Sequence, residues 1–140
     1  MSEHSLAGVA LFEGLSPEAI AGLEKCCTWR RFAAGDSIID RNSDSREVFF
    51  ITEGTVRVVN YSFSGREVAF DDIQAGSVFG ELAALDGQPR SANIVALEAT
   101  TAACMTPTIF RDVLLQHPRI ALNLSLRLAR IIRASVDRIM

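Results

Sequence analysis

The chain has 140 residues, of which 49% are hydrophobic, and its formal net charge is −3. This length indicates a single domain, 1–140, with a sizeable core, and the negative charge excludes an overall basic field that recruits nucleic acid. Three cysteines without a C-x-x-C spacing argue against a disulfide framework or a zinc site, and no apolar run approaches the ~18 residues of a membrane span. We therefore expect reduced thiols and a cytoplasmic setting.

The first predicted element is a helix near the N-terminus. In the stretch GLSPEAIAGLEKCC, Ser16 is suited to cap a helix and Pro17 to occupy its first position. Ile20 and Leu23 then lie on one face of that helix, which we expect to be buried.

Short β-rich runs follow, separated by residues that favour turns. They are TWRRF, SIID, EVFFITEG, TVRVVNYSF, EVAFDDI, SANIVALE and TTAACM. Glycines separate several of these runs, namely Gly35, Gly54, Gly65 and Gly76. The intervals between the glycines are typical of an antiparallel barrel or sandwich. The runs VRVV and SFSGREVAF predict a hairpin with its turn near Ser64 and Gly65. We expect the region from about 28 to 106 to form a β-barrel.

Two helices are predicted after the barrel. Pro107 opens one over TIFRDVLLQH, and Pro118 closes it and begins the next. The second helix carries a polar stripe of Arg119, Asn123, Arg127, Arg130 and Asp137. Residues 119–140 contain five arginines and one aspartate, a net charge of +4, which leaves −7 for residues 1–118. We expect these arginines to form a solvated face rather than a nucleic-acid contact.

The apolar surface of this last helix is wider than a single face. It comprises Leu122, Leu124, Leu126, Leu128, Ala129, Ile131, Ile132 and Val136. A helix this apolar buries two sides, of which one can pack on the barrel. A second copy of the same helix is the simplest partner for the other side, so we expect a homodimer through helix 119–140.

The stretch FGELAALDGQPRSA, residues 79–92, carries charges that an ordinary core strand does not need. It begins like a strand and continues, after Gly80, as a short helix over ELAAL. The unpaired N–H groups at a helix start suit a phosphate, and Gly80 lets a ligand approach the backbone closely. Arg90 adds a guanidinium fork for two phosphate oxygens, with the hydroxyl of Ser91 beside it.

Glu81 extends this interpretation from a phosphate to a nucleotide. A carboxylate beside a phosphate is repulsive unless it faces a different group, and Glu81 can accept a hydrogen bond from a ribose hydroxyl while it pairs with Arg90. Phosphate and sugar hydroxyl together indicate a nucleotide. Taken alone, Glu81 and Arg90 also fit a surface ion pair of little energetic value.

These residues resemble the phosphate-binding cassette of cyclic-nucleotide-binding domains, a family that includes protein kinase A regulatory subunits, cyclic-nucleotide-gated channels and bacterial CRP/FNR proteins. The cassette elements present are Phe79, Gly80, Glu81, Leu82, Ala83, Pro89, Arg90, Ser91 and Ala92. The resemblance covers roughly residues 10–138 and is closest to the CRP/FNR branch in the last two helices. It implies a mainly β fold, an antiparallel β-roll or jelly-roll barrel with an N-terminal helix and with B and C helices at 107–140.

The resemblance also implies roles for individual residues. Glu81 would take the ribose 2′-hydroxyl beside the backbone of residues 80–82. Arg90 and Ser91 would hold the exocyclic phosphate oxygens, with help from the N–H of Ala92.

Three further residues are placed by the resemblance at the sugar and base. Val58 and Phe70 fall where the family lines the sugar–base pocket, although both also suit ordinary core positions. Ser135 falls where CRP-like proteins contact the base, although it also suits a helix surface.

The leading hypothesis is a non-catalytic sensor of a cyclic mononucleotide, without a metal. The bacterial character of the last helix favours cAMP, while the hydroxyl of Ser91 leaves cGMP open. A phosphodiesterase would need a metal cluster or an activated water, which His4 and His117 cannot supply. A haem or iron–sulfur sensor, or a sensor without ligand, fits poorly with an intact cassette and three unclustered cysteines.

The output of the sensor has two interpretations. Because VDRIM ends the last helix without a cap, we expect the regulatory half of a CRP/FNR-type transcription regulator whose DNA-binding domain is absent from this chain. The alternative is a stand-alone domain that regulates a partner protein. The gene sequence after residue 140 would distinguish them.

Overall fold

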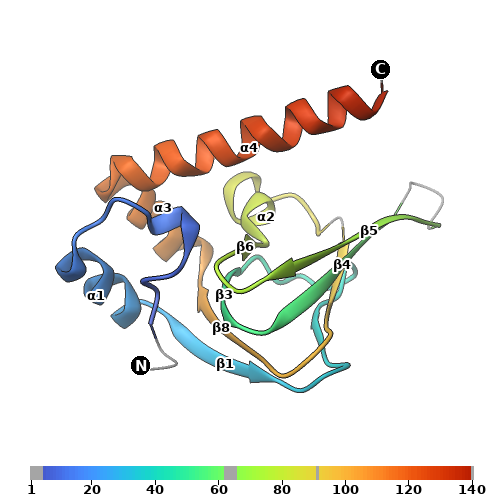
Figure 1. Ribbon diagram of the computed structural model, residues 1–140, viewed down its shortest axis with the longest axis horizontal. Helices are drawn as coiled ribbons and strands as arrows, with labels where there is room; N and C mark the ends of the chain where they lie inside the picture. Colours follow the sequence, from blue (N-terminus) through green and yellow to red (C-terminus); the bar gives the residue numbers. More distant parts are fainter. Residues whose placement is uncertain (1–4, 62–65, 91, 140) are drawn as a thin grey trace.

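The computed structural model describes residues 5–61, 66–90 and 92–139. Two four-stranded antiparallel sheets face each other across a shared core, and helices from both ends of the chain pack against them (Figure 1). The predicted mainly β fold with flanking helices is confirmed.

The strands follow the runs expected from the sequence. The first sheet has the order β1 (Thr28–Phe32), β8 (Thr100–Met105), β3 (Val48–Glu53) and β6 (Val78–Phe79). The second has the order β2 (Ser37–Ile39), β7 (Ala92–Ala96), β4 (Thr55–Tyr61) and β5 (Glu67–Gln74). The antiparallel register of β4 with β5 confirms the predicted hairpin. Its turn, predicted near Ser64 and Gly65, lies outside the described residues.

Four helices begin where the sequence predicts them. They are α1 (Pro17–Lys25), α2 (Glu81–Asp86), α3 (Pro107–Gln116) and α4 (Pro118–Ile139). The 3₁₀ turn η1 (Ala10–Phe12) was not predicted. Ser16 Oγ accepts a hydrogen bond from the N–H of Ala19 at 3.1 Å, which confirms the predicted cap of α1. A proline stands at the first position of α1, α3 and α4, where its missing N–H costs nothing.

Strand β3 supplies side chains to two apolar cores, because successive residues of a strand point to opposite faces. Phe49 belongs to the core between the two sheets. Phe50 belongs to the core between the first sheet and the helices, where its ring centroid lies 4.9 Å from that of Phe12 and 6.3 Å from that of Phe110. The first sheet therefore fixes the helices relative to the barrel.

Helix α4 packs on this second core through one face only. Ile120 and Leu124 are buried there. Asn123 was expected in a solvated stripe, but its Nδ2 donates to the carbonyls of Leu11 and Glu13, both at 3.0 Å, and so holds η1 against α4. The other face of α4 exposes Leu122, Leu126, Ile132 and Val136. Ile131 is also exposed, but it lies seven residues after Leu124 and so on the same side of the helix as Leu124.

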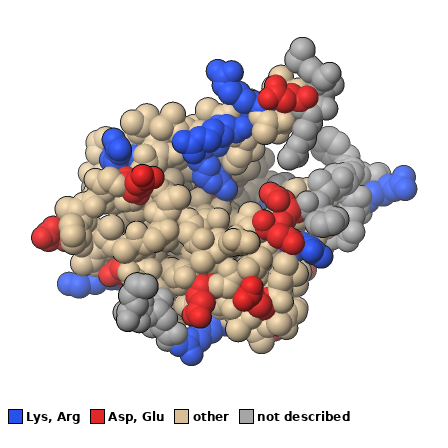
Figure 2. Space-filling view, in the orientation of Figure 1, with Lys and Arg blue, Asp and Glu red and all other residues tan. Residues whose placement is uncertain are grey.

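Basic side chains gather over α4 on the face shown in Figure 2, whereas the barrel beneath it carries both signs of charge. Arg119 and Arg130 are exposed, as predicted for a solvated face.

The three cysteines are free thiols. Burial, as the largest cause, raises the pKa of Cys27 and of Cys104 to about 12. Neither thiol is therefore a reactive thiolate near neutral pH.

Candidate functional site

The stretch 79–92 leaves the first sheet at β6 and turns at Gly80 into α2. Gly80 caps the N-terminus of this helix with a φ of +82°, and Gly87 ends it with a φ of +70°. Both angles lie in the left-handed region that glycine adopts without steric cost. The strand start followed by a short helix agrees with the prediction from this stretch.

Position 80 requires glycine for two reasons: its backbone angle and the lack of room for a side chain. A Cβ atom at this position would lie 2.7 Å from Nη1 of Arg90 and 2.8 Å from the carbonyl oxygen of Glu47. The absence of a side chain therefore lets the guanidinium of Arg90 lie against the start of α2.

We expect Gly80→Ala to cost about 1–2 kcal/mol from the left-handed backbone alone, and to weaken ligand binding because the new methyl group displaces Arg90. Urea unfolding and calorimetric titration with cyclic nucleotides measure the two effects. Gly87→Ala is the matched control, since its φ is also left-handed but an added Cβ meets no atom within 4 Å. It should lose stability and keep affinity. Equal affinities of the two variants would contradict the steric explanation.

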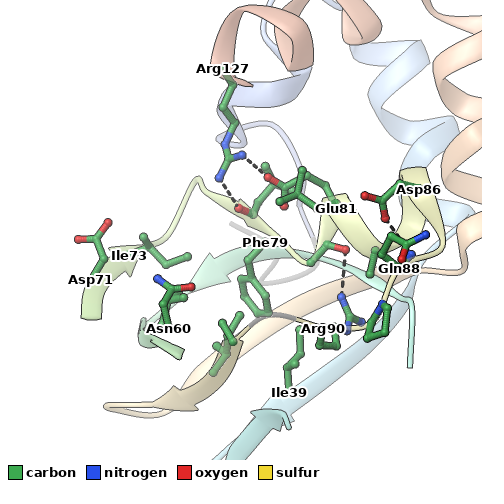
Figure 3. A pocket seen from close by; sticks show the side chains of 18 residues that line it. Ile39, Asn60, Asp71, Ile73, Phe79, Glu81, Asp86, Gln88, Arg90 and Arg127 are labelled. Atoms are coloured by element: carbon green, nitrogen blue, oxygen red, sulfur yellow. Dashed lines mark hydrogen bonds and ion pairs between the residues drawn. The ribbon is translucent and has the colours of Figure 1, made fainter. Parts of the chain in front are cut away.

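A cavity of about 440 Å³ opens beside this stretch (Figure 3). Both sheets, α2 and α4 contribute to its walls, which include Ile39, Val58, Asn60, Asp71, Ile73, Val78, Phe79, Gly80, Glu81, Leu82, Ala83, Asp86, Gln88, Pro89, Arg90, Ala92, Ile94 and Arg127. The ring of Phe79 stacks on that of Phe49 at a centroid distance of 5.0 Å, so this part of the wall is packed into the core between the sheets. The volume falls in the range of small-molecule sites.

Arg90 is held at one end of the cavity with only 8% of its surface exposed. Its Nη1 donates to the carbonyl of Gly80 at 3.0 Å, and its Nη2 donates to the carbonyl of Glu47 at 2.8 Å and to Ser45 Oγ at 3.2 Å. Its Nε is buried without a hydrogen-bond partner among the described residues.

The charge of Arg90 is poorly compensated by its surroundings. Burial, and then the positive charge of nearby Arg46, lower the pKa of Arg90 below the usual range of a guanidinium. An arginine nevertheless stays charged at neutral pH. A desolvated cation at a cavity wall is an arrangement that an anion stabilises.

Glu81 is buried, and its partner is Arg127 of α4 rather than Arg90. Nη1 of Arg127 donates to Oε1 of Glu81, and its Nη2 donates to the carbonyl of Val78 at 3.0 Å (Figure 3). The expected pairing of Glu81 with Arg90 is therefore wrong, as is the expectation that Arg127 belongs to a solvated face. The carboxylate that begins α2 is fastened to the long helix.

Arg127 is a cavity residue that the sequence did not reveal. Its position in the stripe of α4 indicated a polar face, but its partner lies 46 residues away in the chain. Glu81 itself could have indicated such a residue. If Arg90 binds the phosphate, a buried Glu81 needs a cation from another element of the chain.

The opposite end of the cavity is formed by β4 and β5. Val58 and Ile73 supply apolar walls there, and Asn60 and Asp71 supply polar groups. Figure 3 shows Asn60 and Asp71 on the side of the cavity away from Arg90. The cavity thus has a cationic end, a carboxylate at its α4 side, and a mixed apolar and polar end.

The structure brings most of the predicted site residues to this one cavity, namely Val58, Phe79, Gly80, Glu81, Leu82, Arg90 and Ala92. Ser91 lies outside the described residues. The backbone of Phe70 pairs with that of Val59, one residue along from the cavity residue Asp71, and its side chain lies outside the described part of the structure.

Ser135 is not brought to the cavity of its own chain. It is exposed on α4, where its Oγ donates to the carbonyl of Ile131 at 2.9 Å. Its contact with a base stays a prediction.

Two features are absent from the described part of the chain. Residues 5–61, 66–90 and 92–139 contain no group of three or more His, Cys, Asp or Glu side chains arranged to hold a metal ion. Within the same ranges, no helix has both the length and the apolar character needed to cross a membrane.

Comparisons with known proteins match the same part of the chain. A sequence model of the cyclic nucleotide-binding domain matches residues 29–117. The cyclic AMP receptor protein of Thermus thermophilus is 28% identical over 128 residues, which cover 91% of this chain and 59% of that protein. The cAMP-dependent protein kinase regulatory subunit of Mycosarcoma maydis is 35% identical over 98 residues, or 70% of this chain and 18% of that one.

A solved structure supports the same assignment. The crystal structure of the Thermus thermophilus catabolite activator protein superposes with a TM-score of 0.84 at 27% identity, over 93% of this chain and 61% of that chain. The chain spans less than two thirds of the length of each of these relatives. With its sheets, its cassette and the family match over 29–117, the chain belongs to the cyclic nucleotide-binding domain family.

Proposed function

We propose that this chain is a non-catalytic sensor that binds a cyclic mononucleotide in the cavity beside α2 and transmits the event through α4. The observation that carries the proposal is the buried, incompletely paired Arg90 at one end of a 440 Å³ cavity that also contains Glu81. A cyclic nucleotide offers one negative charge, a ribose hydroxyl and an apolar base face, which are the three features that this cavity complements.

The phosphate belongs at the Arg90 end. Three hydrogen bonds to Gly80, Ser45 and Glu47 already hold the guanidinium in place, so the ligand bears little cost of ordering that side chain. The guanidinium of Arg90, which lines the cavity, then donates to a phosphate oxygen. Ser91 and the N–H of Ala92 complete the phosphate site in this proposal.

The ribose belongs beside Glu81, close to the backbone of Gly80 and Leu82. Arg127 occupies Oε1 of the carboxylate, which leaves Oε2 to accept from the 2′-hydroxyl. The base then extends over the face of β4 and β5 that lines the cavity, where Val58 forms part of the wall.

This placement connects the ligand to α4. Arg127 joins Glu81 and the carbonyl of Val78 to the long helix, so a ligand that engages Glu81 also changes the surroundings of Arg127. A ligand with different affinities for two positions of α4 shifts the balance between them. The proposed output is therefore a change in the position of α4.

The names of two relatives mention cAMP, so cAMP is the ligand to test first and cGMP is tested beside it. For the whole protein, we propose a cytoplasmic, homodimeric regulator of the CRP/FNR type, whose DNA contact is made by a domain outside this chain. A stand-alone domain that acts on a partner protein is the second candidate, because the kinase regulatory subunit among the relatives carries the same domain.

Isothermal titration of the purified chain tests the proposal. We expect saturable binding of cAMP or cGMP with one site per chain, and much weaker binding of 5′-AMP, whose open phosphate carries an additional charge and a different shape. If neither cyclic nucleotide binds at ligand concentrations up to about 1 mM, which corresponds to roughly −4 kcal/mol, the proposal is wrong.

We expect Glu81→Ala to weaken cAMP binding by about tenfold to a hundredfold, because a hydrogen bond to a charged group contributes about 1.5–3 kcal/mol. The same variant should lose the preference for cAMP over 2′-deoxy-cAMP, which lacks the hydroxyl. Competition with a fluorescent cyclic nucleotide measures both ratios. An undiminished preference in the variant would show that Glu81 does not read the ribose.

A further inference from the structure

We propose that Asp71 and Asn60 select the base of the ligand and favour guanine over adenine. This inference rests on the proposed cyclic-nucleotide site and assigns its base end. Neither residue belongs to the cassette, and both lie on the strands that close the cavity opposite Arg90.

The strand register places the two side chains on the same face of the second sheet. Asp71 of β5 is paired with Val58 of β4, and Asn60 of β4 with Ala69 of β5. Asn60 and Asp71 are therefore diagonal neighbours, a relation that puts residues about 7–8 Å apart across two strands. Both line the cavity, and Figure 3 shows both on the side away from Arg90. A nucleotide with its phosphate at Arg90 directs its base toward them.

The polar groups of Asn60 and Asp71 are available to a ligand. Across the described part of the chain, neither side chain forms a hydrogen bond or an ion pair. The next residue shows the contrast, since Asp72 accepts hydrogen bonds from Arg57 at 2.7 and 3.0 Å. Asp71 is thus an exposed carboxylate that no group in the described part of the chain engages, so a ligand would replace the water around it.

The chemistry of this pair matches guanine better than adenine. A carboxylate is only an acceptor, and a carboxamide both donates and accepts. Guanine offers the adjacent donors N1–H and N2–H₂ to Asp71, and its O6 accepts from the NH₂ group of Asn60. Adenine offers the N6 amine alone, and its N1 lone pair faces the carboxylate unfavourably. A carboxylate that bonds such donors favours a ligand that carries them over one that lacks them.

Titration of the chain with cGMP, cAMP and cIMP, by displacement of a fluorescent cyclic nucleotide, tests the inference. A well-placed pair of hydrogen bonds to a base edge corresponds to about a 10- to 100-fold preference, which we expect for cGMP over cAMP. cIMP, which keeps N1–H and lacks the N2 amine, should fall between them. Asp71→Ala should reduce the affinity for cGMP by a similar factor and leave that for cAMP within about threefold.

Asp72→Ala is the matched control, because it removes the same charge from a side chain that bonds Arg57 instead of lining the cavity. Its cGMP-to-cAMP ratio should equal that of the unmodified chain. Thermal melting of both variants without ligand shows whether they are folded. If Asp71→Ala is not folded, Asp71→Ser replaces it in the titration. Tighter or equal binding of cAMP in the unmodified chain, or an unchanged ratio in the Asp71 variant, would overturn the base assignment alone. Failure of all three nucleotides to bind would overturn the proposed function with it.

Discussion

Arg90→Ala is expected to weaken cyclic-nucleotide binding by about two orders of magnitude or more. The ligand phosphate would lose a charge-assisted contact in a desolvated site, and removing one partner of a buried charge pair costs about 2–5 kcal/mol. Calorimetry with the ligand that binds the unmodified chain measures the loss. An unchanged affinity would exclude this cavity as the phosphate site.

Two further variants separate charge from geometry. Arg90→Lys keeps the positive charge but loses the fork and the Nε donor, so its affinity should fall between those of the arginine and alanine forms. Arg57→Ala removes a surface arginine that pairs with Asp72 outside the cavity and should leave the affinity unchanged. Because Arg90 also holds the carbonyls of Gly80 and Glu47, urea unfolding of each variant is needed to correct the binding data for lost stability.

The fold was predictable because its determinants are local. Ser16 and Pro17 define the start of α1 within one turn, and the alternation in TVRVVNY defines β4 without knowledge of its partners. The pairing of strands was not predictable in this way. The first sheet joins β1 to β8, and this register depends on which side chains fill the two cores.

The candidate site was predictable where it is one continuous stretch and unpredictable where it is assembled from distant strands and helices. Residues 79–92 carry the glycine, the acid and the arginine at fixed spacing, so the sequence alone brings Gly80, Glu81 and Arg90 together. Arg127 comes from α4, and its role depends on how that helix crosses the cassette.

The base end could not be assigned from the sequence alone, because Asn60 and Asp71 come from strands outside the cassette. Phe70 was selected by counting back from the cassette, and its contact with the ligand stays a prediction. Successive residues of a strand point to opposite faces, so a count along β5 has to be exact before it identifies a wall of the cavity.

The exposed face of α4 is an apolar surface that no other described residue of the same chain covers. Leu122 and Leu126 are 52% and 46% exposed, and Val136 is 46% exposed. Together with Ala129 they stand at intervals of four, three and seven residues, which is the spacing of a coiled-coil seam with Arg133 at the intervening position. The opposite face of the same helix is already buried through Ile120 and Leu124. These observations favour the proposed symmetric contact, in which α4 of a second copy covers the seam, with Ile132 and its neighbours near the axis.

Leu126→Glu is expected to convert such a dimer to a monomer. Two-fold symmetry places both copies of the new carboxylate in one interface, and each buried, unpaired charge costs several kcal/mol, so association should weaken by about a hundredfold or more. Sedimentation at micromolar protein, with and without cyclic nucleotide, measures the change. Leu115→Glu is the matched control, because Leu115 is also an exposed leucine, at 81%, but lies on α3 away from the seam.

Comparing sedimentation with and without ligand tests whether binding in the cavity affects α4. If the ion pair of Arg127 with Glu81 transmits binding to the helix, saturating ligand should change the dimer dissociation constant of the unmodified chain and of Leu115→Glu by the same factor. Arg127→Ala should reduce that factor toward one while leaving a dimer. A strict monomer in every condition, with Leu126→Glu altering neither size nor solubility, would refute the dimer and leave the seam for a different protein, because an apolar face of this extent on one helix needs a covering surface.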